Sequence, residues 1–473
     1  MSANETTERP AFSNASVFVW LLSISAIWAH TSQPREVYQY WLHFDPIQSP
    51  AIIAAILSAF ASALFPTRTY VFLTFCVLQL ITIFLRIPNV PTHIVMEFLL
   101  SGSVVCAYLV LAYRQKSFSV HFQDLFNAYA PVARWLLIIM YFFGTFHKIN
   151  PGFLSLESSC AVPFVEAFGF LDYILPPSVS GNIAIYATLI LEFAAMLLLL
   201  NRRTKYYGML LGMPFHIIIG ISPFGVLAHF SVFAMTLHAA FLPSSFGQRV
   251  KADSLVPAAL RRPEAIRTIT VLVVLLQIVF ARFSLWSLMN LEFLVFAAVL
   301  FTLIAKYGKF TEADPDYRLV SHVIPANAFA LLFLVQSVGP YIGLSTTGAV
   351  QMFSGLRTEG GISNHYLIKN PPYLFSYLED VVHFESTNDE FLDTIGSHGL
   401  GMNMYNYQEY LQRPETEARL PIYLRVNDEP VALTNEQEFL AFAQKYFKSY
   451  SYFERKLLHF KLIDGPNPKQ CRH

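Results

Sequence analysis

Long apolar runs separated by short polar loops fill the first 340 residues of the chain. Eleven runs can be drawn, at residues 15–30, 51–65, 68–86, 93–113, 132–149, 182–200, 205–222, 225–242, 267–285, 288–306 and 322–340. Several of them are shorter than the roughly 20 residues that a full membrane span requires. The pattern therefore predicts an all-α polytopic membrane bundle of nine to eleven transmembrane helices.

The pattern changes after about residue 344, where charged residues and turn residues become frequent. Residues 421–426 (PIYLRV) are typical of a strand, and Gly360 and Gly361 predict a tight turn. Residues 434–437 (TNEQ) resemble a capping box, which predicts a helix running to about Leu462. We therefore expect a membrane bundle over residues 1–343 and a small C-terminal α+β domain over residues 344–473.

Composition and charge support an integral membrane protein. Of 473 residues, 54% are hydrophobic and 14% are charged, against about 25% charged in soluble proteins. Lys plus Arg and Asp plus Glu balance at 32 each, so net charge gives no reason to expect a nucleic-acid partner. The polar residues 1–14 lack a basic segment, and we expect the first apolar run to be retained as an anchor.

Basic residues gather in alternate loops, at residues 114–116, 202–205, 249–267 and 306–318. Alternate loops lie on the same side of a membrane, and the positive-inside rule makes that side cytoplasmic. The acidic loop at residues 151–181 contains no Lys or Arg and falls on the opposite side. With eleven spans, the C-terminal domain is also extracytoplasmic.

The four cysteines show no metal-binding spacing, and we expect no metal site. Cys76 and Cys106 lie in apolar runs, where cysteine usually behaves as a small hydrophobic residue. Cys160 and Cys471 lie outside the membrane in this topology. The sequence leaves open whether they form a disulfide.

An aromatic-rich apolar helix runs into His147 and Lys148 and is stopped by Asn150-Pro151. Lys148 is therefore expected in the last turn of a membrane-length helix. It is either a snorkelling side chain, with its amine in water, or a functional amine. The predicted topology places it on the side where the charge rule disfavours lysine, which favours a function.

Five further ionisable residues stand out at membrane depth, where such groups usually face a partner or a cavity: His93, Glu97, Glu192, His216 and His229. Each of them either bonds neighbouring helices together or lines a site. For His216 a local reason also exists, because Pro214 frees a backbone carbonyl that an imidazole can bond. The histidines share the outer half of the bilayer with Lys148 in this topology. Such a group is typical of an acid–base pocket for a lipid-soluble substrate.

Residues 144–151 (GTFHKINP) resemble the helix end of the vitamin K-dependent γ-glutamyl carboxylases and of the wider HTTM family of multi-pass proteins. In that family the lysine matched by Lys148 is taken as the base that deprotonates vitamin K hydroquinone. Phe215-His216 resembles the family's Phe-His pair, and His93 resembles its histidine at an outer helix start. Lys148 follows His93 by 55 residues and precedes His216 by 68, which is similar to the family's spacing.

The resemblance covers roughly residues 15–310, and residues 352–365 are similar to a tail motif of bacterial HTTM proteins. It implies a quinol oxygenase or epoxidase that uses vitamin K hydroquinone or menaquinol and O₂, in contact with membrane lipid. The implied catalytic residues are Lys148, His93 and His216, with Glu192, His229 and Glu97 supporting them or contacting the substrate. The family's large lumenal region has only residues 344–473 in its place. We therefore expect no protein substrate, no glutamate carboxylation and no use of CO₂.

A non-enzymatic membrane scaffold, assembly factor or carrier is the alternative, in which the polar residues serve folding. The tail motif is equally open, because Arg357, Glu359 and His365 are either surface charges or a polar lid over the membrane site. The two functions differ in whether Lys148 is needed for activity or for stability.

Overall fold

The computed structural model describes residues 13–31, 48–166, 174–222, 227–256, 262–310, 317–351, 353–413 and 420–464. The chain divides into two compact units, which are described separately here. The first unit comprises Met1–Arg86, His93–Tyr141 and Ile190–Phe333. The second comprises Ile87–Thr92, Phe142–Leu189 and Leu334–His473.

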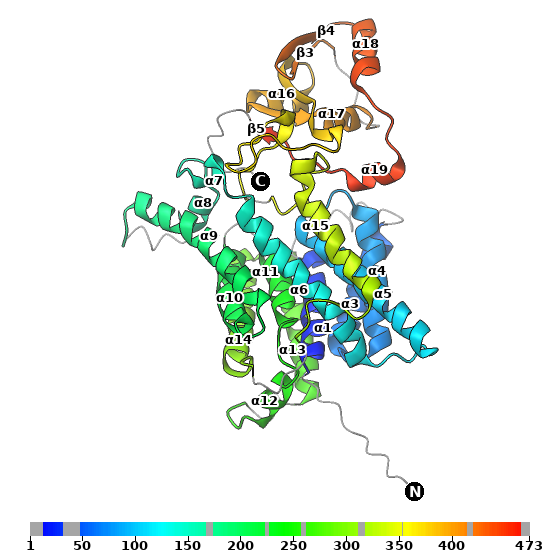
Figure 1. The fold of residues 1–473 in the computed structure, drawn as a ribbon, viewed down its shortest axis with the longest axis vertical. Coiled ribbons are helices and arrows are strands. Elements are labelled where there is room, and N and C mark those ends of the chain that lie inside the picture. The colour runs from blue at the N-terminus through cyan, green and yellow to red at the C-terminus, as the bar shows by residue number, and fades with distance from the viewer. Residues whose placement is uncertain are drawn as a thin grey trace. The chain divides into compact units, whose positions relative to one another are not determined.

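Each of the eleven apolar runs forms a helix (Figure 1). The helices are α1 (Asn14–Thr31), α3 (Gln48–Leu64), α4 (Thr69–Arg86), α5 (Thr92–Gln115), α6 (Phe122–Phe146), α9 (Pro177–Leu200), α10 (Lys205–Gly220), α11 (Leu227–Ala239), α13 (Pro263–Arg282), α14 (Trp286–Tyr307) and α15 (Asn327–Ile342). In the described chain seven helical segments are long and apolar enough to cross a membrane, namely α1, α4, α5, α6, α9, α14 and residues 324–342. They suggest an integral, multi-pass membrane protein.

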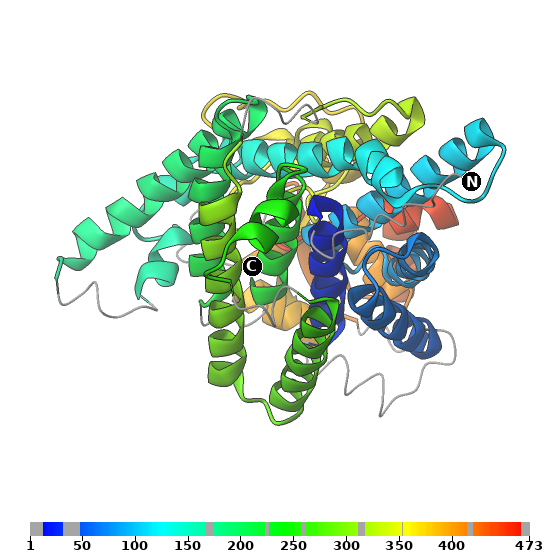
Figure 2. The same cartoon turned by 90° about the horizontal axis from the view of Figure 1, so that it is seen from below.

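Helix α1 lies at the centre of the first unit, against α3, α11 and α13 (Figure 2). All of its residues except Trp20 are buried, as expected of a helix that is apolar all round. Small side chains let its neighbours approach closely, and the Ser23 hydroxyl donates a hydrogen bond to Ser62 on α3 at 3.0 Å. The helix is therefore a core element of the bundle.

The basic loops contact one another within the first unit. The Lys205 amine lies 4.2 Å from the Tyr317 ring centroid, and Arg249 donates to the Lys309 carbonyl oxygen. Lys306 and Asp253 form an ion pair at 2.6 Å. Hydrogen bonds from Lys306 and its neighbouring tyrosine hold the pKa of the Asp253 carboxyl well below its ordinary value. Three of the four predicted basic loops thus meet at one place, as loops on one side of a membrane should.

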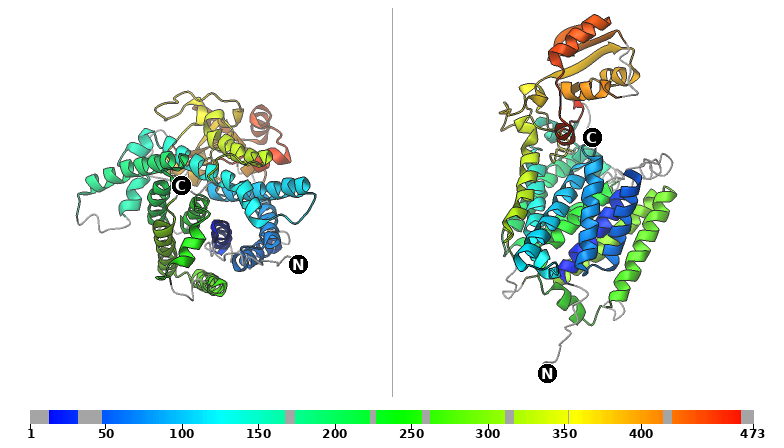
Figure 3. Two further views of the ribbon diagram at one scale, coloured as in Figure 1. Left: turned by 60° about the horizontal axis from the view of Figure 1, so that its bottom comes forward. Right: turned by 90° about the vertical axis from the view of Figure 1, so that its right-hand side faces the viewer.

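A five-stranded antiparallel sheet forms the C-terminal part of the second unit, in the order β4-β3-β1-β2-β5. Its strands are β1 (Val381–Thr387), β2 (Leu400–Asn403), β3 (Ile422–Val426), β4 (Glu429–Leu433) and β5 (Ile463–Asp464). Helices α16 (Glu390–Ser397), α17 (Met404–Leu411) and α18 (Glu436–Tyr446) pack on it (Figure 3). Residues along β3 alternate between buried and exposed, which confirms the predicted strand.

The helix predicted to run to Leu462 is wrong. Helix α18 ends at Tyr446, and a separate short helix, α19 (Tyr452–Leu457), follows. The Gln408 side chain bonds both the N–H and the carbonyl of Lys448, which holds this linker in a non-helical conformation. Ser451 and Glu454 then form a capping box that opens α19. Helix α18 itself is capped by Asn435.

Smaller elements complete the described chain. Helices α7 (Pro151–Leu154) and α8 (Ala161–Glu166) follow α6, and α12 (Phe246–Ala252) precedes α13. Three short 3₁₀ helices lie at Ile324–Ala326, Glu359–Gly361 and Ser376–Leu378. Gly360 and Gly361 have φ values of 70° and 75°, which confirms the predicted tight turn.

Candidate functional site

A buried polar network crosses the helices of the first unit. We call it the histidine network, and it consists of Ser25 and His30 on α1, Gln79 and Arg86 on α4, His93 and Glu97 on α5, and His229 on α11. Its members come from α1, from the consecutive helices α4 and α5, and from α11. The fold therefore gathers residues from three separate parts of the sequence.

Glu97 is the best-bonded member of the histidine network. One carboxyl oxygen accepts from the Ser25 hydroxyl at 2.9 Å, and the other accepts from the Gln79 amide nitrogen at 2.9 Å. The Gln79 oxygen in turn lies 3.3 Å from Nε2 of His30. Both carboxyl oxygens are thus satisfied, as a buried carboxyl requires.

His93 and His229 bond directly to each other through their Nε2 atoms. Their ring centroids are 4.2 Å apart, and both side chains are buried. One Nε2 must carry the proton and donate it, while the other accepts. Within the described residues neither Nδ1 atom has a hydrogen-bond partner. The pair therefore keeps hydrogen-bonding capacity that a bound molecule can use.

Arg86 supplies positive charge to the histidine network. It lies at the end of α4 and within electrostatic range of His30, His93, Glu97 and His229. An anion formed beside the two imidazoles would be attracted by this guanidinium, and more strongly in a buried site than in water. The network is thus suited to hold a negatively charged intermediate.

His216 belongs to a second cluster in the same unit. Its ring lies 5.7 Å from Tyr141, 5.7 Å from His238 and 5.4 Å from Phe230. The Tyr141 hydroxyl is 3.2 Å from Nε2 of His238, whose Nδ1 donates to a backbone carbonyl, so the tyrosine is the donor. A side chain at Gly212 would collide with His238 and Tyr141, which explains the glycine there.

Several of the predicted site residues therefore lie together. His93 and His229 are in contact, and the Phe230 ring lies 5.7 Å from His93 and 5.4 Å from His216. Glu97 follows His93 by one helical turn. Glu192, on α9, is buried and lies within electrostatic range of the Tyr141 hydroxyl.

Lys148 belongs to the second unit, and it follows α6 in a turn and does not lie in the helix's last turn as predicted. Its side chain is 7% exposed, and its amine lies 5.6 Å from the Phe153 ring centroid. Convergence of Lys148 with His93 and His216 on one pocket stays a prediction.

The side chain of Asn150 fixes this turn. Its amide nitrogen donates to the carbonyls of His147 and Ser354 at 2.7 and 2.8 Å, and its oxygen accepts from the Phe153 N–H at 3.0 Å. Gly152 and Gly355 pass so close that a β-carbon on either would press on the other's backbone. The turn is therefore built against the tail motif.

Two histidines extend that contact. His147 donates from Nδ1 to the Val350 carbonyl at 3.2 Å, and His365 donates from Nε2 to the Phe146 carbonyl at 2.8 Å. His365 is 0% exposed, so it is not a surface charge. Burial lowers the pKa of His365, and the bond to Phe146 opposes this in part. Arg357 and Glu359 are half-buried.

Sequence reasoning missed His30, Gln79, Arg86, Tyr141 and His238. A signal existed for two of them, because Gln79 and Arg86 are seven residues apart and share a helical face. The described residues contain no group of three or more His, Cys, Asp or Glu side chains placed to hold a metal ion.

Two of the cysteines are free, Cys76 and Cys106, whereas Cys160 is disulfide-bonded. Cys471 lies outside the described residues.

Comparison with models of known protein families gave no match, and comparisons with curated proteins and with solved structures gave none either. Any functional argument therefore starts from the residues above.

Proposed function

We propose that this chain is an integral membrane enzyme that oxygenates a lipid-soluble quinol, in the manner of the vitamin K-dependent carboxylase and HTTM families. One observation carries the proposal. Two buried imidazoles, His93 and His229, bond each other within electrostatic range of Arg86 and leave both Nδ1 atoms without a partner among the described residues. Such an arrangement suits a hydroxyl that loses its proton and becomes an anion.

In the proposed reaction the amine of Lys148 takes the proton of a quinol hydroxyl. The resulting anion reacts with O₂, so that one oxygen atom enters the quinone product as an epoxide and the other leaves as water. A positioned base contributes roughly 10²–10⁴-fold to such a step. His93 and His216 would hold the oxyanion, with His229, Glu97 and Glu192 orienting them.

We further propose that the basic loops are cytoplasmic and that the second unit's C-terminal domain is extracytoplasmic. The clustering of Lys205, Arg249 and Lys306 supports one basic side. The disulfide at Cys160 supports an oxidising compartment for the opposite side. Cysteine labelling of intact cells, at sites introduced near Glu157 and Arg203, tests the orientation, because only the former should react from outside.

Purified protein in lipid nanodiscs should convert reduced vitamin K or menaquinol to an epoxide under ¹⁸O₂, with one labelled atom in the product. Lys148→Ala should reduce turnover about 10²–10⁴-fold without lowering the melting temperature. The matched control is Lys369→Ala, an exposed lysine of the same unit. The proposal would be contradicted if the wild type were inactive when supplied with either quinol and O₂. It would also be contradicted if Lys148→Ala kept the activity of the wild type.

A scaffold or assembly factor remains the second candidate, and the bonding of Glu97 favours it. The chain from Ser25 through Glu97 and Gln79 to His30 is satisfied and joins three helices, as structural polar contacts do. Under this function Lys148→Ala would unfold the protein, and the wild type would turn over no quinol. Glutamate carboxylation is not proposed, and labelled CO₂ should not enter a glutamate peptide.

A further inference from the structure

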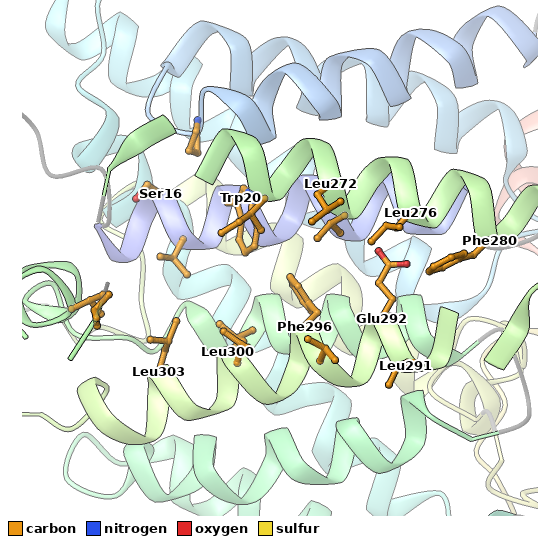
Figure 4. Close-up of a pocket in the computed structure, with 18 of the residues that line it drawn as sticks. Ser16, Trp20, Leu272, Leu276, Phe280, Leu291, Glu292, Phe296, Leu300 and Leu303 are labelled. Carbon is orange, nitrogen blue, oxygen red and sulfur yellow. The ribbon is translucent and has the colours of Figure 1, made fainter. Parts of the chain in front are cut away.

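The first unit also contains an apolar pocket that is separate from the histidine network. A pocket of about 620 Å³ lies among α1, α13 and α14 (Figure 4). That volume is within the range of small-molecule sites, about 300–1,000 Å³. Its walls are almost entirely apolar, with Trp20, Leu276, Phe280, Phe296 and Leu300 among them. It shares no residue with the histidine network.

Glu292 is the exception in this apolar wall. Its carboxyl points from α14 toward α13, beside Leu276 and Phe280 (Figure 4). Both carboxyl oxygens are buried, and neither has a hydrogen-bond partner among the described residues. An ionisable group without a partner at membrane depth is costly and usually marks a function.

The other polar groups of the wall are already occupied. The Trp20 indole N–H donates to the Thr270 hydroxyl at 2.7 Å. The Ser16 hydroxyl donates to the Ser13 carbonyl at 2.9 Å. Glu292 is thus the one lining group that the structure leaves available to a ligand's polar head, as far as the described residues extend.

The pocket is long and narrow. Leu291 and Leu303 line it and are twelve residues apart on α14, which corresponds to about 18 Å along the helix. An apolar pocket of about 620 Å³ and about this length can take one extended hydrocarbon chain. Glu292 lies near the end of the pocket where α14 begins, so a head group and a tail have separate places.

The Glu292 carboxyl determines which head group a bound molecule can have. Among the described residues that line the pocket there is no Lys or Arg, so none of them offers the carboxyl a cation. A carboxylate head, as in a fatty acid, would place a second acid beside Glu292. A protonated amine would instead form a charge-assisted hydrogen bond, which is stronger than one from a neutral hydroxyl.

We propose that this pocket binds a single-chain lipophilic amine, with its ammonium head on Glu292 and its hydrocarbon chain along α13 and α14. This site is separate from the quinol chemistry proposed above. Its occupancy can therefore be measured without any enzymatic turnover.

The experiment uses the full chain in nanodiscs and hexadecylamine with a photoreactive diazirine near its tail. Cross-links should map to the tail end of the pocket, around Val299 and Leu303. Unlabelled hexadecylamine should compete about tenfold better than hexadecanol. The difference in free energy between a charge-assisted and a neutral hydrogen bond corresponds to about a tenfold ratio of binding constants. Hexadecanoic acid should compete least.

Glu292→Gln keeps the shape of the side chain and should abolish the preference for the amine over the alcohol. Glu264→Gln, at an exposed carboxyl on α13, is the matched control and should leave the preference unchanged. Val299→Trp should reduce binding of all three compounds by filling the pocket, and Val299 is 57% exposed, so folding should survive.

Four results would overturn the proposal. Equal competition by the three compounds in the wild type would make the pocket an ordinary groove for lipid chains. An amine preference that survives Glu292→Gln would place the head elsewhere. Cross-links outside α1, α13 and α14, or amine binding unaffected by Val299→Trp, would remove the pocket itself.

Discussion

The histidine network of the first unit and the Lys148 turn of the second unit are both buried and polar, but they are held in different ways. In the network, side chains bond to side chains, as Glu97 does to Gln79 and Ser25. In the turn, side chains bond to backbone carbonyls, as Asn150 and His365 do. The network joins separate helices, whereas the turn joins a helix end to the tail motif.

This difference bears on what each region can do. A side chain that bonds another side chain can rotate, exchange a proton or accept a ligand without moving the backbone. A turn fixed through its carbonyls cannot change without unfolding locally, so it holds Lys148 in one position. Substitutions of the turn side chains that bond backbone carbonyls, such as Asn150, should therefore cost stability, and substitutions in the network should cost less.

The largest effect is expected for Asn150→Asp. The substitution preserves size but replaces two N–H donors by an oxygen that faces the carbonyls of His147 and Ser354. We expect a loss of about 3–5 kcal/mol in the free energy of unfolding, because buried donors are lost and a charge is buried. Thermal unfolding in detergent measures it. Asn182→Asp, at an exposed asparagine, is the control, and equal stability of the two variants would remove the distinction between the regions.

The disulfide at Cys160 should rank next. Disulfides typically contribute about 2–4 kcal/mol, chiefly by restricting the unfolded chain. Cys160→Ser should lower the melting temperature, and addition of a reductant should not lower the melting temperature of this variant further. Cys106→Ser, at a free cysteine, should do neither. A reductant that leaves the wild type unchanged would exclude a stabilising bond.

A smaller effect is expected for Glu97→Gln in the histidine network. The amide keeps one acceptor oxygen and loses the other, so one of the bonds to Ser25 and Gln79 is weakened. Side-chain hydrogen bonds between membrane helices average about 0.6 kcal/mol, and we expect a loss of that order. Glu97→Leu, which leaves both partners unsatisfied, should cost more. If Glu97→Gln destabilised as strongly as Asn150→Asp, the two regions would not differ as argued.

The helices and the sheet were largely open to prediction, because they depend on local pattern. The apolar runs coincide with helices, and the alternation of residues 421–426 gave β3. The helix predicted to reach Leu462 failed for a non-local reason. The helix is interrupted near Lys448, because the side chain of Gln408, 40 residues away in the sequence, bonds the Lys448 backbone.

The candidate site was less predictable because it too depends on contacts between residues that are far apart in the sequence. His93 and His216 were found because ionisable groups are rare at membrane depth. Arg86 and His30 were missed because each lies at a helix end, where charge and polarity are ordinary. Their role in the network follows from helix packing, which the spacing of residues along one helix does not specify.

The last effect concerns pH and the tail motif. His365 donates from Nε2 to the Phe146 carbonyl, and its Nδ1 accepts from the N–H groups of Leu367 and Ile368. Protonation of Nδ1 would break both of these accepted bonds. Burial holds the folded-state pKa of His365 below its ordinary value of about 6.5, so the unfolded chain binds the proton more readily.

Stability should therefore be complete above about pH 6.5 and should fall as the pH drops below it, toward the lower folded-state pKa. At pH 5.5 the loss from this one group is at most about 1.4 kcal/mol. Thermal unfolding at pH 7.5 and 5.5 measures it. His365→Gln, whose amide can replace both kinds of bond, should show a smaller pH dependence than the wild type, whereas His398→Gln, at an exposed histidine, should match the wild type. An unchanged pH dependence in His365→Gln would mean that protonation of this residue does not loosen the tail motif.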